Sequence, residues 1–188
     1  ILERFDYHKI IFCGDLGFQL PPVSGYEFDV EDFPVIEHKT NRRCKCPKLK
    51  KRLDFMREKI KEGKDFLFGM SNNVFGIDII KKGDIDYDIK DLIICPTHKT
   101  KDYYTEKYNH LEKYIVLENC LDYSNGDIVY EKIKGVKNEL RHAFTIHSIQ
   151  GETAKDKLYS DMFKMRSLKM LYTAFSRAEY LHQIVLMR

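Results

Sequence analysis

The sequence predicts an α/β domain built on a largely parallel sheet with flanking helices. Short apolar runs alternate along the chain with longer helical patterns, which is the order that parallel strands and crossover helices require. The 188 residues are 43% hydrophobic and 32% charged, a composition typical of globular proteins. No apolar run approaches the roughly 20 residues that a membrane span needs. We therefore expect a folded domain with no membrane partner.

The first half of the chain is expected to hold four strands, one of them at the edge of the sheet, and one helix. His8–Cys13 and Pro34–His38 are short, mostly apolar runs. Pro47–Lys61 begins with proline, which suits a first helical position, and its apolar residues lie three or four apart, as in an amphipathic helix. Asp91–Cys95 is another buried strand, and residues 63–91 form a long connection with an edge strand.

The second half continues the alternation, with one interruption. Residues 114–140 are rich in β-branched and turn residues, so we expect a short β insertion there. The expected elements are the helices Lys99–Tyr114 and Leu168–Arg177, and the strands Tyr114–Leu117, Asp127–Ile133, Ala143–His147 and Gln183–Met187.

Charge and cysteine content exclude some classes of protein. Thirty-two basic and 29 acidic residues give a net charge of +3, too mild to indicate nucleic-acid binding by itself. The five cysteines are odd in number and lack the spacing of a zinc site. We expect no protein-held metal and a reducing, intracellular compartment, since the first residues also lack a secretory signal pattern.

Three polar clusters follow expected strands or end an expected helix, where α/β proteins commonly bind ligands. The first contains Asp15 and Gln19, the second follows the strand at Ala143, and the third ends at Arg177. Each also has a purely structural interpretation. A turn after a strand, a polar loop or an arginine at a helix end would account for each cluster taken singly.

Taken together, these segments resemble the motifs of superfamily 1 helicases, in the order of that family. Gly14–Val23 (GDLGFQLPPV) resembles motif III of the RecD-like branch, and Asn41–Arg43 resembles motif IV. Thr145–Thr153 (TIHSIQGET) resembles motif V, and Leu171–Ala178 (LYTAFSRA) resembles motif VI. The resemblance implies a RecA-like, P-loop NTPase-type fold and an ATP-dependent DNA helicase.

The family's phosphate-binding loop and its Asp-Glu strand end are missing from the sequence. The resemblance implies that residues 1–33 end a first RecA-like domain and that residues 34–188 form the second. The insertion at about 114–140 occupies the place of a small β-barrel in RecD-like enzymes. ATP and Mg²⁺ would then be shared with an N-terminal RecA-like domain preceding Ile1, which would hold the metal, and this chain alone would be inactive.

The resemblance also implies residue roles on the nucleotide side. Arg177 and Arg43 would neutralise charge on the γ-phosphate, with Arg42 as an alternative to Arg43, and Gln19 would sense that phosphate. Glu152 would accept a hydrogen bond from the ribose. The other nucleotide-binding residues implied are Asp15, Gln150 and Gly151.

On the nucleic-acid side, the implied role is to hold phosphates of single-stranded DNA without reading sequence. The residues concerned are Thr97, Thr145, His147 and Ser148, together with His98 or Lys99. The RecD-like resemblance favours movement from 5′ to 3′.

Two other classes remain open at this point. A nucleic-acid-binding or structural protein could keep this fold without catalysis, which the missing phosphate loop favours. An unrelated α/β nucleotide-binding enzyme is the other, although it would need a glycine-rich phosphate loop. The sequence upstream of Ile1 would separate these classes.

Overall fold

The computed structural model describes residues 17–18, 20, 34–36, 41–64, 73–74, 77–149, 152–161 and 167–188. The expected strand His8–Cys13 lies outside these residues, as do four of the predicted site residues: Asp15, Gln19, Gln150 and Gly151.

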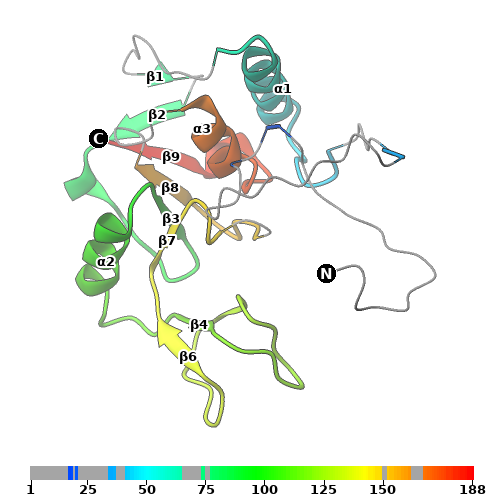
Figure 1. Ribbon diagram of the computed structural model, residues 1–188. Helices are drawn as coiled ribbons and strands as arrows, with labels where there is room; N and C mark the ends of the chain where they lie inside the picture. The colour runs from blue at the N-terminus through cyan, green and yellow to red at the C-terminus, as the bar shows by residue number, and fades with distance from the viewer. Residues whose placement is uncertain are drawn as a thin grey trace.

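The centre of the fold is a six-stranded sheet in the order β1-β2-β9-β8-β3-β7 (Figure 1). Five neighbouring strands are parallel, and only β1 runs antiparallel, at the edge. The prediction of an α/β fold with a largely parallel sheet is therefore confirmed. The strands are β1 (Asn73–Val74), β2 (Ile77–Ile80), β3 (Leu92–Cys95), β7 (Ala143–Thr145), β8 (Leu158–Asp161) and β9 (Ile184–Met187).

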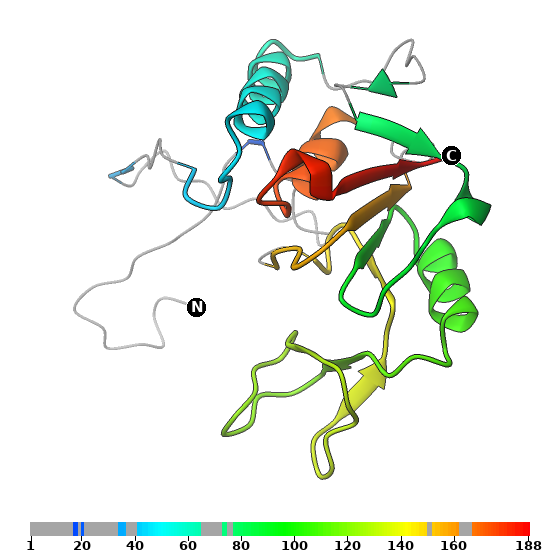
Figure 2. The same ribbon diagram turned by 180° about the vertical axis from the view of Figure 1, so that it is seen from behind.

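Helices cover both faces of this sheet (Figure 2). Helices α1 (Pro47–Lys61) and α3 (Leu168–Phe175) pack on one face, and α2 (His98–Lys107) packs on the other. Strand β3 shows why both faces are covered. All four of its side chains are buried, with Ile94 in the core under α1 and α3 and Ile93 in the core under α2. Such continuously apolar strands are typical of parallel sheets.

Helix α1 confirms the predicted Pro47–Lys61, with proline in the first turn and its apolar stripe buried. Helix α3 starts at the predicted residue, where the Ser167 hydroxyl accepts a hydrogen bond from the Met170 amide. The prediction for α2 was too long, because the helix ends at Lys107 and Tyr114 lies in the next strand. A turn at Tyr108–His110 follows Lys107, and the chain then enters a second sheet.

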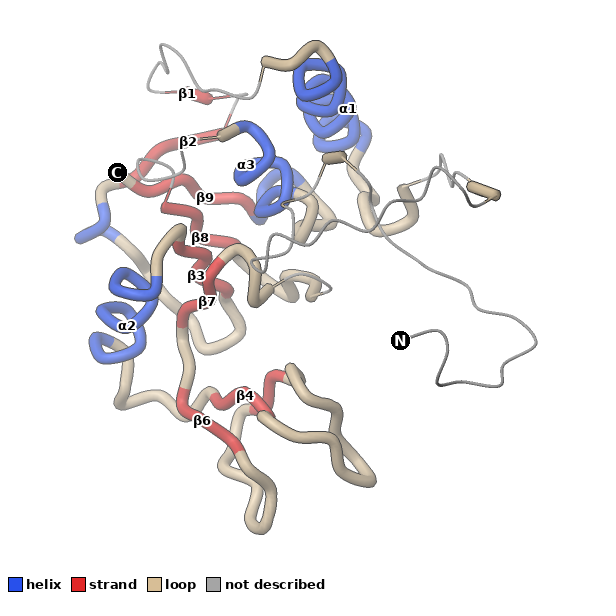
Figure 3. The backbone as a smooth tube through the Cα atoms, in the orientation of Figure 1, coloured by secondary structure: helices blue, strands red, loops and turns tan. Residues whose placement is uncertain are grey.

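Residues 114–140 form this second, three-stranded antiparallel sheet, in the order β5-β4-β6 (Figure 3). Its strands are β4 (Tyr114–Val116), β5 (Ile128–Val129) and β6 (Asn138–Leu140). We call it the small sheet. The expected strand Asp127–Ile133 is wrong in length, since only two of its residues pair, and β6 was not expected from the sequence.

A buried polar chain joins the small sheet to the main sheet. Lys113 Nζ donates to the Asp91 carbonyl and, at 3.3 Å, to the Tyr87 hydroxyl. The Tyr87 hydroxyl lies 3.1 Å from His142 Nδ1, and His142 Nε2 lies 3.0 Å from the Leu111 carbonyl. Lys113 and His142 are fully buried. Lys113 lies directly before β4, and His142 lies two residues after the end of β6. These bonds therefore fix the two connections through which the small sheet is attached.

Two other expectations differ from the structure. Residues 34–36 form no strand and are exposed, so the described part of the expected strand Pro34–His38 is wrong. Strand β8 was not expected at all, because two of its four residues, Ser160 and Asp161, are polar. The buried Asp161 carboxylate is paired at 2.7 Å with Lys82, which lies 79 residues earlier in the chain. A buried charge is tolerated when it is paired in this way.

Candidate nucleotide and nucleic-acid sites

Two groups of predicted site residues lie at opposite ends of the parallel strands. Arg43 and Arg177 belong to segments at the amino ends of β8 and β9, which we call the amino edge. Glu152 lies on the segment that joins the two edges, since its amide donates to the Ile149 carbonyl at 3.2 Å and the Ala154 amide donates to the Arg177 carbonyl at 2.8 Å. Thr97, His147 and Ser148 follow β3 and β7, at what we call the carboxyl edge. Strands β3 and β8 have four residues each, so the two edges are separated by about 13 Å along the strands.

At the amino edge, the loop before α1 is fastened to the turn after α3. Arg43 donates a hydrogen bond from its guanidinium to the Ser176 carbonyl at 3.0 Å. The Lys45 amide donates to the Glu179 carbonyl at 2.9 Å, and the two side chains form an ion pair at 2.8 Å. The segments that resemble motifs IV and VI are therefore in direct contact, although more than 130 residues separate them.

The side chain of Asn41 shapes this loop. Its Oδ1 accepts hydrogen bonds from the amides of Arg43, at 3.1 Å, and Cys44, at 3.0 Å. Asparagine forms such turns readily because its short side chain reaches the backbone two residues on. Of the two adjacent arginines, Arg42 is exposed, and Arg43 is half-buried and reaches Ser176.

The sequence suggested that Arg177 emerges from the end of its helix. The structure shows a different position for this side chain. Helix α3 ends at Phe175, and the Arg177 side chain folds back and is only 2% exposed. Its Nε donates to the Thr173 carbonyl at 3.1 Å, and its NH2 group donates to the Ser176 hydroxyl at 2.8 Å. The last carbonyls of a helix lack partners within the helix and attract a cation, which accounts for this position. Arg43 and Arg177 thus converge on Ser176, one on its carbonyl and the other on its hydroxyl.

The segment 152–154 reaches the same place from the motif V side. The Ala154 amide donates to the Arg177 carbonyl at 2.8 Å, and Gln183 Nε2 donates to the Ala154 carbonyl at 3.2 Å. Gln183 also accepts hydrogen bonds from the amides of Glu179 and Tyr180. This role of Gln183 could not be predicted from the sequence, because it depends on a fold that brings distant segments together.

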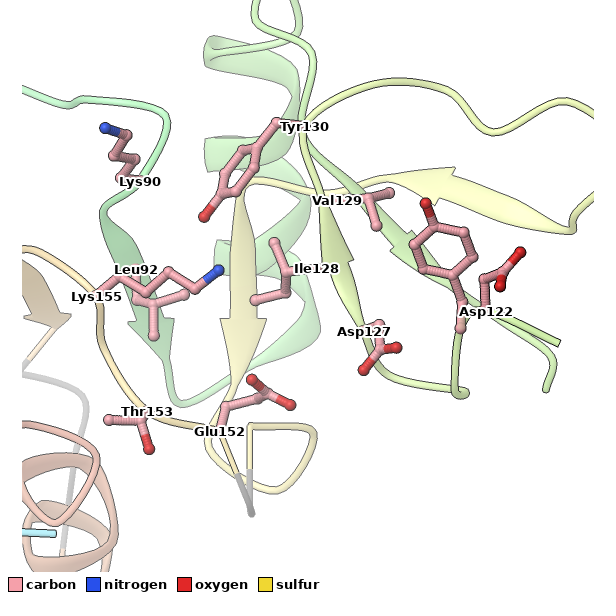
Figure 4. A pocket seen from close by; sticks show the side chains of 11 residues that line it. Lys90, Leu92, Asp122, Asp127, Ile128, Val129, Tyr130, Glu152, Thr153 and Lys155 are labelled. Carbon is pink, nitrogen blue, oxygen red and sulfur yellow. The ribbon is translucent and has the colours of Figure 1, made fainter. Parts of the chain in front are cut away.

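Glu152 points toward a cavity next to this group of segments (Figure 4). Its carboxylate has no hydrogen bond or ion pair within the described part of the chain. A half-buried carboxylate of this kind can accept hydrogen bonds from the hydroxyls of a ligand.

At the carboxyl edge, two adjacent parallel strands end side by side. Cys95 pairs with Thr145, and the Ile146 amide donates to the Cys95 carbonyl at 3.2 Å. Thr97 then caps α2, its hydroxyl accepting from the Thr100 amide at 3.3 Å. Thr97, His98 and Lys99 are exposed at this helix N-terminus, where the helix dipole favours anions.

The loop after β7 presents two of its polar residues and buries a third. Strand β7 ends at Thr145, which is only 7% exposed. Its hydroxyl donates to Ser148 Oγ at 3.1 Å and accepts from the Ser148 amide at 3.4 Å. His147 and Ser148 are exposed. Thr145 therefore holds the turn in shape, and His147 and Ser148 are the groups that this turn offers to a ligand.

Among the described residues, no group of three or more His, Cys, Asp or Glu side chains could hold a metal ion. No helix in those residues is long and apolar enough to span a membrane.

Comparison with solved structures shows what this fold is similar to. A structure of Bacteroides Pif1 bound to ssDNA aligns with a TM-score of 0.52 at 15% identity, over 77% of this chain and 49% of that one. A structure of Pif1 helicase from Bacteroides in complex with ADP-AlF3 and ssDNA aligns with a TM-score of 0.50 at 18% identity, over 77% of this chain and 49% of that one. A third structure concerns DNA unwinding at forked dsDNA by two coordinating Pif1 helicases. It aligns with a TM-score of 0.51 at 15% identity, over 77% of this chain and 48% of that one.

This likeness shows that the chain has the α/β fold found in Pif1 helicases. The chain spans about half the length of these structures. No protein-family model matches the sequence, and the search of curated proteins gave no match.

Proposed function

We propose that residues 34–188 form the second RecA-like motor domain of an ATP-dependent DNA helicase of superfamily 1, in its RecD-like branch. Residues 1–33 would complete the first domain, which would bring the phosphate loop and the Mg²⁺ ligands. The enzyme would couple ATP hydrolysis to movement along single-stranded DNA and to unwinding of the duplex.

The observation that carries the proposal is the separation of two sites within one domain. Contacts between distant segments gather Arg43 and Arg177 at the amino edge, and Ala154 ties the segment that carries Glu152 to Arg177. The exposed Thr97, His147 and Ser148 gather at the carboxyl edge. A motor needs such an arrangement, because the nucleotide and the DNA must be held at the same time and influence each other through the same strands.

At the amino edge, the chain would supply positive charge to the nucleotide. ATP brings the bond whose cleavage drives the motor. Arg43 and Arg177 would release their carbonyl and hydroxyl acceptors and turn to the phosphates, which bind guanidinium groups more strongly because they are charged. Glu152 would hold the ribose, and Gln183 would keep segment 152–154 against the turn that carries Arg177.

At the carboxyl edge, the chain would hold the DNA backbone. The N-terminus of α2 offers backbone amides together with Thr97, and the neighbouring turn offers His147 and Ser148. Such contacts hold phosphates without reading bases. A small number of them suits a protein that releases and rebinds the strand at every step.

The similarity to Pif1 structures supports this proposal through the fold. Two of those structures were solved with ssDNA, and one of these two also with ADP-AlF3. At 15–18% identity, the roles of individual residues here rest on the geometry described above and on the motif resemblance.

Activity assays on two forms of the protein test the proposal. The 188 residues alone should bind single-stranded DNA but show no ATPase activity, because the sequence contains no phosphate loop. A form extended at the N-terminus to include such a loop should hydrolyse ATP, be stimulated by single-stranded DNA and unwind duplexes. ATPase activity from the 188 residues alone would show that the nucleotide site is misplaced. Single-strand binding with no ATPase in the extended form would favour a catalytically inactive binding protein.

A further inference from the structure

A cavity of about 330 Å³ lies between the amino edge of the main sheet and the small sheet (Figure 4). One wall comes from the main domain, including Leu92 at the start of β3 and Glu152 and Lys155 in the loop before β8. The other wall comes from the small sheet, including Ile128 and Tyr130. The volume lies within the range of small-molecule sites, roughly 300–1,000 Å³.

The charged groups in this cavity do not neutralise each other. Glu152 and Lys155 both line it, yet they form no ion pair, and neither side chain has a hydrogen bond within the described part of the chain. The Lys155 ammonium instead lies 5.4 Å from the centre of the Tyr130 ring. A ligand that fits here would donate hydrogen bonds to the carboxylate and offer acceptors to the ammonium.

The remaining wall is apolar and aromatic. The Tyr130 ring and the side chains of Ile128 and Leu92 line the same space. An aromatic ring beside aliphatic side chains suits a flat heterocycle, since bases stack on aromatic rings regardless of sequence. Asp122 and Asp127 add a second and a third carboxylate to the lining, against the two ammonium groups of Lys90 and Lys155, which makes the cavity unfavourable for a phosphate. A base joined to a sugar with free hydroxyls meets all of these conditions.

The cavity adjoins the turn that carries Arg177. Thr153 lines the cavity, and the amide of the next residue, Ala154, donates to the Arg177 carbonyl at 2.8 Å. A nucleotide with its sugar and base in the cavity would therefore have its phosphates beside the residues assigned to them above.

We infer that this cavity binds the ribonucleoside end of a nucleotide, so that the small sheet takes part in nucleotide recognition. Tyr130 stacks on the base, Glu152 accepts a hydrogen bond from a ribose hydroxyl, and Lys155 meets an acceptor on the base. This inference rests on the proposed function for the position of the phosphates. It extends that function by giving the small sheet, through Tyr130, a role in binding the base. The same chemistry is offered by free ATP and by a ribonucleotide in an RNA strand.

Ligand titrations of the 188-residue chain, followed by NMR, test the inference. The probes are adenosine, 2′,3′-dideoxyadenosine, inorganic tripolyphosphate, oligothymidylate and oligouridylate. The variants are Tyr130→Ala, Tyr130→Phe and Glu152→Gln. Tyr103→Ala and Glu106→Gln serve as matched controls, because both residues are exposed on α2, which covers the opposite face of the sheet from α1 and α3. A thermal melt of each variant verifies folding.

Adenosine should bind, and its affinity should fall about tenfold in Tyr130→Ala and in Glu152→Gln. Tyr130→Phe and both control variants should bind adenosine with the affinity of the unaltered chain. Dideoxyadenosine should bind the unaltered chain about as weakly as adenosine binds Glu152→Gln. Tripolyphosphate binding should not respond to Tyr130→Ala. Equal adenosine binding by Tyr130→Ala and the unaltered chain, or no adenosine binding at all, would overturn the inference.

The two polymers distinguish a free nucleotide from a ribonucleotide in an RNA strand as the ligand of the cavity. They also test the helicase proposal separately from this inference. Neither oligothymidylate nor oligouridylate should displace adenosine if the cavity serves free nucleotides, and displacement by oligouridylate alone would assign it to an RNA strand. Displacement by oligothymidylate would overturn the ribonucleoside assignment. If oligothymidylate binds and adenosine does not, this inference fails and the helicase proposal stands. Adenosine binding as expected with no oligothymidylate binding would count against the helicase proposal alone.

Discussion

The amino edge and the carboxyl edge of the same sheet hold their polar residues in opposite ways. At the amino edge, Arg177 is 2% exposed, and both arginines are hydrogen-bonded to backbone or side-chain oxygens. At the carboxyl edge, Thr97, His147 and Ser148 are exposed, and buried Thr145 shapes the turn beneath them. Charged side chains are thus held inside the protein at the amino edge, whereas uncharged polar side chains face solvent at the carboxyl edge.

This difference matches the ligands we assign to each edge. Arg43 and Arg177 must give up their hydrogen bonds to protein oxygens before they can bind a phosphate. They therefore bind the nucleotide only when its phosphates are the stronger acceptors. Exposed neutral groups bind a polyanion weakly and reversibly. Substitutions at the two edges should therefore change different measurements.

The largest effect is expected at Arg177. Arg177→Ala in a form that includes the phosphate loop should reduce ATP turnover by about 10³-fold, as loss of a phosphate-facing arginine does in related systems. Affinity for single-stranded DNA should stay nearly unchanged. Arg42→Ala is the control, since Arg42 is exposed beside Arg43, and it should retain most of the activity. If Arg177→Ala instead removed DNA binding and left ATPase activity intact, the assignment of the two edges would be reversed.

Acid should weaken the junction of the small sheet. Burial lowers the pKa of His142 to about 4, from its usual 6.5, and Lys113 adds a repulsive charge. The unfolded chain therefore takes up a proton more readily than the folded chain. The contribution of His142 to stability should be complete above about pH 7 and should fall as the pH drops toward 4, by on the order of 3 kcal/mol.

Urea denaturation at several pH values measures this fall. His142→Gln should lose that part of the pH dependence, whatever its stability at neutral pH. The exposed His110 provides the control, and His110→Gln should keep the slope. An unchanged slope in His142→Gln would mean that His142 is not the group that titrates.

A smaller effect is expected at the carboxyl edge. His147→Ala should weaken binding of single-stranded DNA by about 1.5 kcal/mol, the lower end of the range for a hydrogen bond to a charged group. The apparent KM for ATP in the extended form should not change. His182→Ala, another exposed histidine, is the matched control. A rise in KM for ATP with normal DNA affinity would move His147 to the nucleotide side.

The smallest effect distinguishes a helix cap from a ligand contact. Thr97 and Ser167 both cap helices through their hydroxyls, so either alanine substitution should cost about 1 kcal/mol of stability. Only Thr97→Ala should also lower affinity for single-stranded DNA, because only Thr97 lies at the carboxyl edge. Equal DNA binding by both variants in an oligothymidylate titration would leave Thr97 with the capping role alone.

Much of the fold could be predicted, because its signals are local. Helix α1 has a proline start and an apolar stripe within 15 residues, and strand β3 is a short apolar run. Strand β8 could not be predicted, since its buried Asp161 is stabilised by Lys82 from a distant segment. The ends of β5 and β6 depend on cross-strand pairing, which the local sequence does not encode.

The candidate site was only partly predictable for the same reason. Motif resemblance indicated Arg43, Glu152 and Arg177, and the structure brings their segments together. The burial of Arg177, the linking role of Gln183 and the Lys113–Tyr87–His142 junction all depend on contacts between segments far apart in the sequence.

Chemical-shift mapping of the 188-residue chain with oligothymidylate tests most directly whether the two edges bind different ligands. Backbone signals should shift at Thr97–Lys99 and at His147–Ser148, with signals at Arg43 and at Arg177 essentially unmoved. Shifts centred on Arg43 and Arg177, with the carboxyl edge unaffected, would contradict the division of this domain into a nucleotide edge and a DNA edge.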